Sequence, residues 1–155
     1  MKNYFGAALL VISATATAGE PVQLQGLQKS GTKATGTCGV ARVSVNGVGP
    51  DYVEFSGSVD ISAGANKLTL SGEADSIFFQ DMNQVACLTT PKGPLLVVKA
   101  TCSGSSCIPD DFRVVDPKTA KIVSKGTPDD GCDTACAEKA LGMRLPESLR
   151  PAYAN

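Results

Sequence analysis

The sequence contains no histidine and no tryptophan, and aromatic residues make up only 5% of its 155 residues. Without histidine there can be no Ser-His-Asp triad, no Cys-His nucleophile pair and no histidine-ligated metal. The basic residues are scattered and few aromatics accompany them, so no footprint for nucleic acid or an anionic membrane is present. We therefore predict a protein that is not an enzyme, that holds no cofactor and that does not bind nucleic acid.

Long hydrophobic runs are also missing, and nothing beyond the N-terminus is long and apolar enough to span a bilayer. The N-terminus has the features of a secretory signal peptide: Lys2, then the short apolar segment Phe5 to Ile12, then small residues suited to cleavage. We expect residues 1–18 to be removed, leaving 19–155 as a single β-rich domain without a membrane anchor, in the periplasm or secreted. A buried N-terminal helix is the alternative. Without Lys2 the chain has 13 basic and 15 acidic residues, a net charge of −2.

Six cysteines follow the expected cleavage site, and an even number in an exported chain indicates three disulfides. Six cysteines permit fifteen pairings, and the sequence does not choose among them. We favour the pairing in which two pairs form local links and the remaining pair joins distant strands. The expected pairs are Cys102–Cys107, Cys132–Cys136 and Cys38–Cys87. A zinc site is the alternative, disfavoured by the missing histidine and the oxidising compartment.

Alternating apolar and polar residues predict several half-buried strands in the first half of the chain. The pattern is clear in Thr37 to Asn46, Tyr52 to Ile61 and Leu68 to Gly72, which together suggest an antiparallel meander. Asn46-Gly47 is a hairpin-type turn signal. Residues 20–36 are weakly patterned and predict only a short first strand.

The unbroken apolar run Leu95 to Val98 predicts a central strand covered on both faces. Ile77 to Thr89 precedes it as a longer strand or a broken pair of strands, and Phe112 to Asp116 and Ala120 to Val123 follow as returning strands. The predicted fold is a mainly antiparallel β domain of about seven or eight strands with one short C-terminal helix.

The helix is predicted over Thr134 to Leu141, with Asp133 as its N-cap and Gly142 as its C-cap. The Cys132–Cys136 disulfide would fix its start. Leu145 and Leu149 then form a tail that would pack beneath the sheet.

The central strand leads directly into the segment Cys102-Ser-Gly-Ser-Ser-Cys107, a polar loop with a cysteine at each end. A loop ordered in advance by a disulfide costs less entropy to bind with, and small residues allow close approach in a narrow cleft. The candidate partner-binding residues are Ser103, Gly104, Ser105, Ser106, Asp110 and Asp111. The alternative is a tight hairpin end closed for stability alone.

Two further sites stay open on the residues alone. Lys99 and Ser103 face the same way and would form a Ser-Lys pair, although a lysine on an exposed strand face is normally solvated. Asp129, Asp130 and Asp133 would be able to hold calcium, but the ligand spacing of a calcium-binding loop is missing, and turn-forming and capping roles explain them equally well. We predict no metal site.

In layout the sequence resembles the small periplasmic immunity proteins that protect Gram-negative bacteria from type VI secretion peptidoglycan amidases. The resemblance rests on the signal peptide, the β domain and the CSGSSC loop. It implies an exported inhibitor with a cell-wall hydrolase as its protein partner, in which Ser103, Ser105 and Ser106 lie nearest the toxin's catalytic cysteine. The same features would suit an inhibitor of lysozyme or of another hydrolase.

Two other classes of protein remain as alternatives. A structural or accessory component of a cell-envelope assembly would expose an unpaired edge strand and self-associate. A hydrolase with an unusual carboxylate or Ser-Lys site is disfavoured by the missing histidine.

Overall fold

The computed structural model describes residues 21–49, 57–71, 80–102, 110–126 and 131–150. The predicted signal peptide lies outside the described residues, as do the serines of the predicted cysteine loop. The predicted Cys102–Cys107 disulfide stays a prediction, because Cys107 also lies outside them. No helix in the described ranges is long and apolar enough to cross a membrane. The strands are β1 (Val22–Gln23), β2 (Gln25–Ser30), β3 (Lys33–Cys38), β4 (Ala41–Asn46), β5 (Ser58–Ala63), β6 (Asn66–Ser71), β7 (Gln80–Thr90), β8 (Gly93–Cys102), β9 (Asp110–Asp116) and β10 (Lys121–Ile122).

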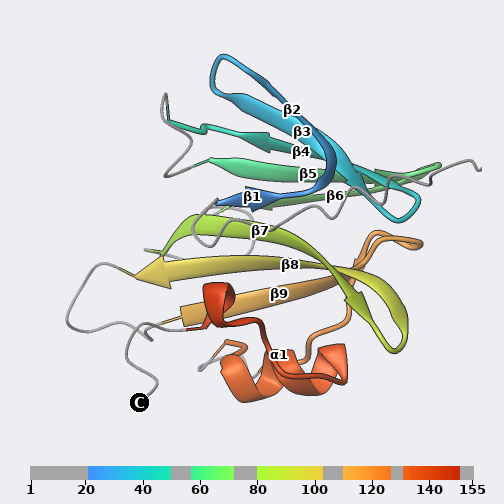
Figure 1. The fold of residues 1–155 in the computed structure, drawn as a ribbon, viewed down its shortest axis with the longest axis vertical. Coiled ribbons are helices and arrows are strands. Elements are labelled where there is room, and N and C mark those ends of the chain that lie inside the picture. The colour runs from blue at the N-terminus through green and yellow to red at the C-terminus, as the bar shows by residue number, and fades with distance from the viewer. Residues whose placement is uncertain (1–20, 50–56, 72–79, 103–109, 127–130, 151–155) are drawn as a thin grey trace, which may run out of the picture.

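These strands form two five-stranded sheets that stack face to face, with a helix beneath the second (Figure 1). One sheet is the meander β2-β3-β4-β5-β6, and the other has the order β1-β7-β8-β9-β10. All paired neighbours are antiparallel except β1 and β7, which run parallel. The helix α1 (Thr134–Leu141) packs on β9. The mainly antiparallel β fold with one short C-terminal helix is therefore confirmed.

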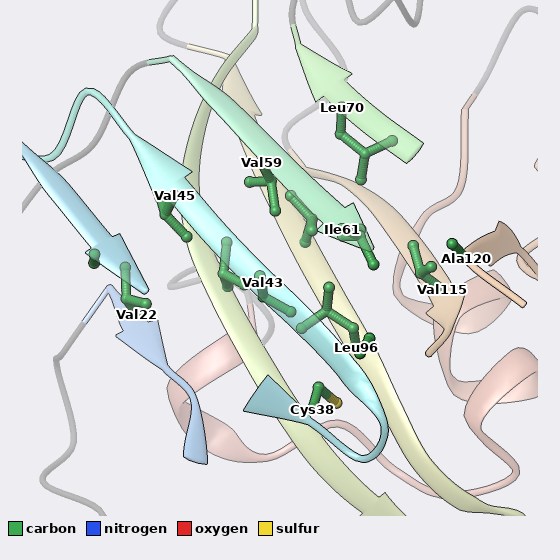
Figure 2. Packing of buried hydrophobic residues seen from close by; sticks show 14 of the residues in the cluster. Val22, Cys38, Val43, Val45, Val59, Ile61, Leu70, Leu96, Val115 and Ala120 are labelled. Carbon is green, nitrogen blue, oxygen red and sulfur yellow. The ribbon is translucent and has the colours of Figure 1, made fainter. Parts of the chain in front are cut away.

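The main core lies between the two sheets. Alternate residues of β4 and β5 point inward, as the period of two requires, and meet β8 from the other sheet (Figure 2). The buried side chains labelled in that view are Val22, Cys38, Val43, Val45, Val59, Ile61, Leu70, Leu96, Val115 and Ala120. The alternation in the sequence therefore identified the inner face of this meander correctly.

A second core lies on the other face of β8 and β9. Val97 and Phe112 pack there with Leu141 of the helix, and all three are almost completely buried. Leu145 and Leu149, the latter in the 3-10 helix η1 (Glu147–Leu149), extend the same cluster. Because the even-numbered residues of β8 face one core and the odd-numbered residues the other, its apolar run is continuous, as predicted.

Strand β3 was not foreseen, because its inward residues are too small to give a hydrophobic signal. Ala34, Gly36 and Cys38 are its buried positions. A Cβ at Gly36 would lie 2.6 Å from the Leu24 side chain, so glycine is required where the segment at Leu24 passes close to β3.

The turn after β4 also differs from the predicted tight hairpin. Gly47 has a positive φ of 81°, so the chain does turn there. However, the backbone N–H of Val48 then donates to the Thr32 carbonyl, 2.9 Å away, and β5 begins only at Ser58. A longer connection therefore separates two strands that are nevertheless paired.

Two of the predicted disulfides are present. Cys38 of β3 is bonded to Cys87 of β7, so this disulfide joins one sheet to the other. Cys132 is bonded to Cys136 at the start of α1. These four cysteines are therefore not zinc ligands, and none of the described cysteines is free.

The ends of α1 are capped as the sequence predicts. The Asp133 carboxylate accepts a hydrogen bond from the Cys136 backbone N–H at 2.8 Å. At the other end, Gly142 adopts a left-handed conformation and donates its N–H to the Glu138 carbonyl. Both ends are thus fixed, and the helix lies at a definite place on the sheet.

Candidate functional site

The candidate site is the end of the β8–β9 pair from which residues 103–109 extend. Thr101 of β8 pairs with Asp110 of β9, so the two ends of that segment start from adjacent positions. Four charged residues gather at this end: Lys99 on β8, and Asp110, Asp111 and Arg113 on β9. Alternation along β9 places Asp110 on the helix side of the sheet, and Asp111 and Arg113 on the opposite side.

On the helix side, Lys99 forms a buried ion pair with Asp110. The Lys99 Nζ lies 3.5 Å from the Asp110 Oδ1, and the two residues are only 7% and 6% exposed. The prediction that Lys99 lies on an exposed strand face is wrong, because it follows Val97 on the face that carries the second core. The Ser-Lys alternative therefore has its lysine in an ion pair with a carboxylate, while Ser103 lies outside the described residues.

Burial raises the pKa of the Asp110 carboxyl above its ordinary value of 3.8. The nearby charge of Lys99 and hydrogen bonds with Lys99 and Thr101 favour the ionised form and offset part of this rise. Asp110 is thus a carboxylate held in place by a pair that itself costs desolvation energy.

We expect Asp110→Asn to change the pH dependence of stability. Because its pKa is raised on folding, the folded protein binds a proton at Asp110 more readily than the unfolded chain does. The contribution of Asp110 to stability is therefore fully present below pH 3.8 and is lost as the pH rises through the raised pKa. The free energy of unfolding of the wild type minus that of the variant should fall between about pH 3 and about pH 7, measured with urea. A difference that rises over this range would contradict the raised pKa.

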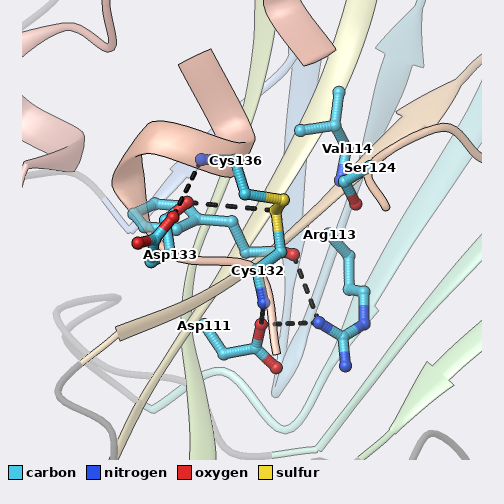
Figure 3. Close-up of polar contacts among 8 residues, drawn as sticks. Asp111, Arg113, Val114, Ser124, Cys132, Asp133 and Cys136 are labelled. Atoms are coloured by element: carbon cyan, nitrogen blue, oxygen red, sulfur yellow. Dashed lines mark hydrogen bonds and ion pairs between the residues drawn. A yellow bond between two sulfur atoms is a disulfide. The ribbon is translucent and has the colours of Figure 1, made fainter. Parts of the chain in front are cut away.

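On the other side of β9, Asp111 ties the strand to the segment that leads into α1 (Figure 3). Its Oδ1 accepts hydrogen bonds from the Arg113 guanidinium at 2.6 Å and from the Cys132 backbone N–H at 2.7 Å. The backbone N–H of Phe112 donates to the Cys132 carbonyl at 2.8 Å. The Asp111 side chain is only 5% exposed, so this network is a buried anchor for the start of β9.

Gly131 completes this anchor, although nothing in its local sequence marks it as a residue of the site. Its φ is +61°, and a Cβ there would lie 2.7 Å from the Asp111 carboxylate. Glycine is therefore needed both for the left-handed conformation and for the close approach. Arg113 was also missed, since a lone arginine on a strand reads as a solvated residue until its partner is known.

The structure describes one of the three carboxylates proposed for calcium, Asp133, and it does not support a calcium site. Asp133 is engaged as the N-cap of α1. Asp129 and Asp130 lie outside the described residues. Within the described ranges there is no group of three or more metal-ligating side chains that could hold an ion.

A cavity of about 190 Å³ lies beside the anchor, lined in part by Arg113 and Ser124. The Ser124 hydroxyl accepts a hydrogen bond from the Val114 N–H at 3.1 Å, and the Arg113 guanidinium is engaged by Asp111. This cavity is therefore bounded by polar groups that already have partners.

The predicted site residues thus fall into two groups. Asp110 and Asp111 lie at the base of the cysteine loop, on opposite faces of the sheet, and each is buried and ion-paired. Ser103 to Ser106 lie outside the described residues. Contact of any of these residues with a partner protein stays a prediction.

Comparisons with protein-family models, with curated proteins and with solved structures give no match for this chain. The functional argument therefore rests on the residues of the site.

Proposed function

We propose that the protein is an exported, non-catalytic binding protein that inhibits a cell-wall hydrolase by presenting its Cys102–Cys107 segment to the active site of that enzyme. The observation that carries the proposal is the double anchoring of the segment's base. Lys99 pairs with Asp110 on one face of the sheet, and Asp111 binds Arg113 and the Cys132 N–H on the other.

This anchoring favours binding because a segment with fixed ends loses less conformational entropy on association. Its two ends leave adjacent, paired strands, and β8 is covered on both faces by packed cores. Buried ion pairs contribute little net stability compared with apolar residues of the same shape, so their presence at the base is better explained by positioning.

The rest of the fold is consistent with an exported binding protein. Two disulfides join described residues, one of them between the sheets, as is typical of chains that mature in an oxidising compartment. In the meander, β2 lies at the edge and has features that oppose edge-to-edge assembly: an irregular register between Gln25 and Gln28, and a positive φ at Gly26. At this edge, these features favour the inhibitor over an envelope component that assembles through β2.

The test is a pull-down from envelope and secreted fractions with the oxidised protein, followed by assay of the recovered enzyme on peptidoglycan. We expect the wild type to recover a cell-wall hydrolase and to inhibit it. The triple variant Ser103→Ala, Ser105→Ala and Ser106→Ala should lose at least about tenfold in inhibition, because hydroxyls buried against a catalytic centre leave unpaired groups when removed.

The matched control removes three serine hydroxyls elsewhere: Ser30→Ala, Ser62→Ala and Ser148→Ala. This control should inhibit as the wild type does. Equal inhibition by the loop variant would move the interface to another surface. Self-association without a recovered enzyme would overturn the inhibitor proposal and support a structural role in the envelope.

A further inference from the structure

A groove of about 740 Å³ lies at the other end of β8 and β9, away from the cysteine loop. It runs between α1, the turn that joins β7 to β8, and the chain around β10. This volume is in the range of ligand-binding clefts. The lining residues are Lys92, Pro94, Leu95, Asp116, Lys118, Val123, Lys125, Ala135, Cys136, Lys139 and Ala140.

The floor of the groove is apolar. Pro94 and Leu95 begin β8, and Ala135 and Ala140 belong to the helix. Val123 is 40% exposed and is one of three exposed large apolar side chains in the described ranges. The groove therefore offers apolar surface that the chain leaves in contact with solvent.

The rim of the groove is basic. Lys92, Lys118, Lys125 and Lys139 come from four separate places in the chain, and all four are exposed. The chain as a whole carries a net charge of −1, so this concentration of lysines does not follow from the composition.

No acidic residue of the described ranges forms an ion pair with these lysines, although Asp116 adds one negative charge to the lining. Asp116 is the one acid among the described residues of the lining, and its carboxylate accepts hydrogen bonds from the Lys118 backbone N–H and the Thr119 hydroxyl in the turn. Glu138, next to Lys139, is directed elsewhere, because it accepts from the Leu145 N–H and pairs with Arg150. None of the four rim lysines forms an ion pair with a residue that the structure describes.

We propose that this groove binds an acidic peptide segment with apolar side chains, supplied by a partner protein. Lysine ammonium groups are compact point charges, and four of them spread around an open rim match several separated carboxylates better than one compact anion. The described residues of the lining include no arginine, the residue whose planar fork suits bidentate phosphate recognition. The apolar floor then accepts the side chains between the carboxylates.

The groove is independent of the proposed inhibitory loop. Pro94 and Cys102 lie at opposite ends of β8, eight residues apart, and a strand rises by about 3.3 Å per residue. The two surfaces are therefore roughly 26 Å apart along the strand. The groove can bind a second segment of the same partner or a different protein, and the loop serines can be replaced without touching it.

The test measures fluorescence anisotropy of a labelled synthetic peptide of alternating glutamate and leucine with the oxidised protein. We expect binding that weakens with salt, and no comparable binding of the matching glutamine–leucine peptide. Lys118→Glu with Lys139→Glu should weaken binding by about tenfold or more, because attraction is replaced by repulsion. Ala135→Trp, which fills the floor without a change of charge, should also weaken binding.

The matched control Lys33→Glu with Lys67→Glu makes the same change of charge on the other sheet and should bind as the wild type does. Thermal unfolding of each variant checks that it is folded. Ala135→Trp still tests the groove if the charge reversal unfolds the protein. No binding by the wild type, equal binding of the glutamine–leucine peptide, or equal weakening by the control would overturn the proposal. Tighter binding of single-stranded DNA than of the acidic peptide would overturn it in favour of a nucleic-acid surface.

Discussion

Replacing Cys38 and Cys87 together by alanine is expected to lower the free energy of unfolding by about 4 kcal/mol, the largest effect we expect for any disulfide in the described ranges. The two cysteines are 49 residues apart in the sequence, and their disulfide joins β3 of one sheet to β7 of the other. Removing it frees a long loop in the unfolded chain and also removes the disulfide that joins the two sheets. Urea unfolding of the oxidised proteins measures the loss.

The control is Cys132→Ala with Cys136→Ala, whose disulfide spans four residues. The same loop-entropy relation gives about 2 kcal/mol for this short link. If both pairs cost the same, the stabilisation would not come from loop entropy. If the loss for the Cys38–Cys87 pair were smaller than the loss for the short pair, the order expected from loop length would be reversed and the prediction would be wrong.

Asp111→Ala is expected to cost about 3–5 kcal/mol, since removing one member of a buried ion pair leaves the other charge uncompensated. In the variant the Arg113 guanidinium loses its carboxylate at 2.6 Å, and the buried Cys132 N–H loses its acceptor. We expect Asp111→Asn to restore part of the loss, because its side-chain oxygen still accepts the Cys132 hydrogen bond. Urea unfolding near neutral pH measures each variant.

Asp116→Ala is the control for Asp111. Its carboxylate also accepts a backbone hydrogen bond, from Lys118, but in an exposed turn, so the expected cost is about 1 kcal/mol. A combined Asp111→Ala and Arg113→Met variant should be more stable than Asp111→Ala alone, because it removes the unpaired charge. If Asp111→Ala costs no more than Asp116→Ala, Asp111 is not the anchor of β9.

The sequence predicted most strands because each carries a signal within its own residues. The alternation over Ala41 to Asn46 and the unbroken run Leu95 to Val98 report directly which faces are buried. The helix was located by its caps, Asp133 and Gly142, whose hydrogen bonds are local. The sequence did not reveal β3, whose buried residues are Ala34, Gly36 and Cys38, because small side chains do not distinguish a crowded strand from a loop.

The candidate site was harder to predict, since its residues matter through partners that are distant in sequence. Asp110 and Asp111 were chosen for their place beside the loop, and only the pairing of β8 with β9 shows that Lys99 and Arg113 hold them. The lysine-rimmed groove left no signal at all in the sequence. Its rim residues Lys92 and Lys139 are brought together only when α1 packs on the sheet.

The sequence by itself thus determined the β class and the place of the helix, because periodicity and capping act over a few residues. It favoured the two disulfides that the structure shows but did not exclude other pairings. The tertiary structure decided the division of the strands between two sheets, the burial of Lys99 and the position of the basic groove. These depend on which elements pack against one another. The free energy of that packing is shared among residues far apart in the chain, so no local pattern encodes it.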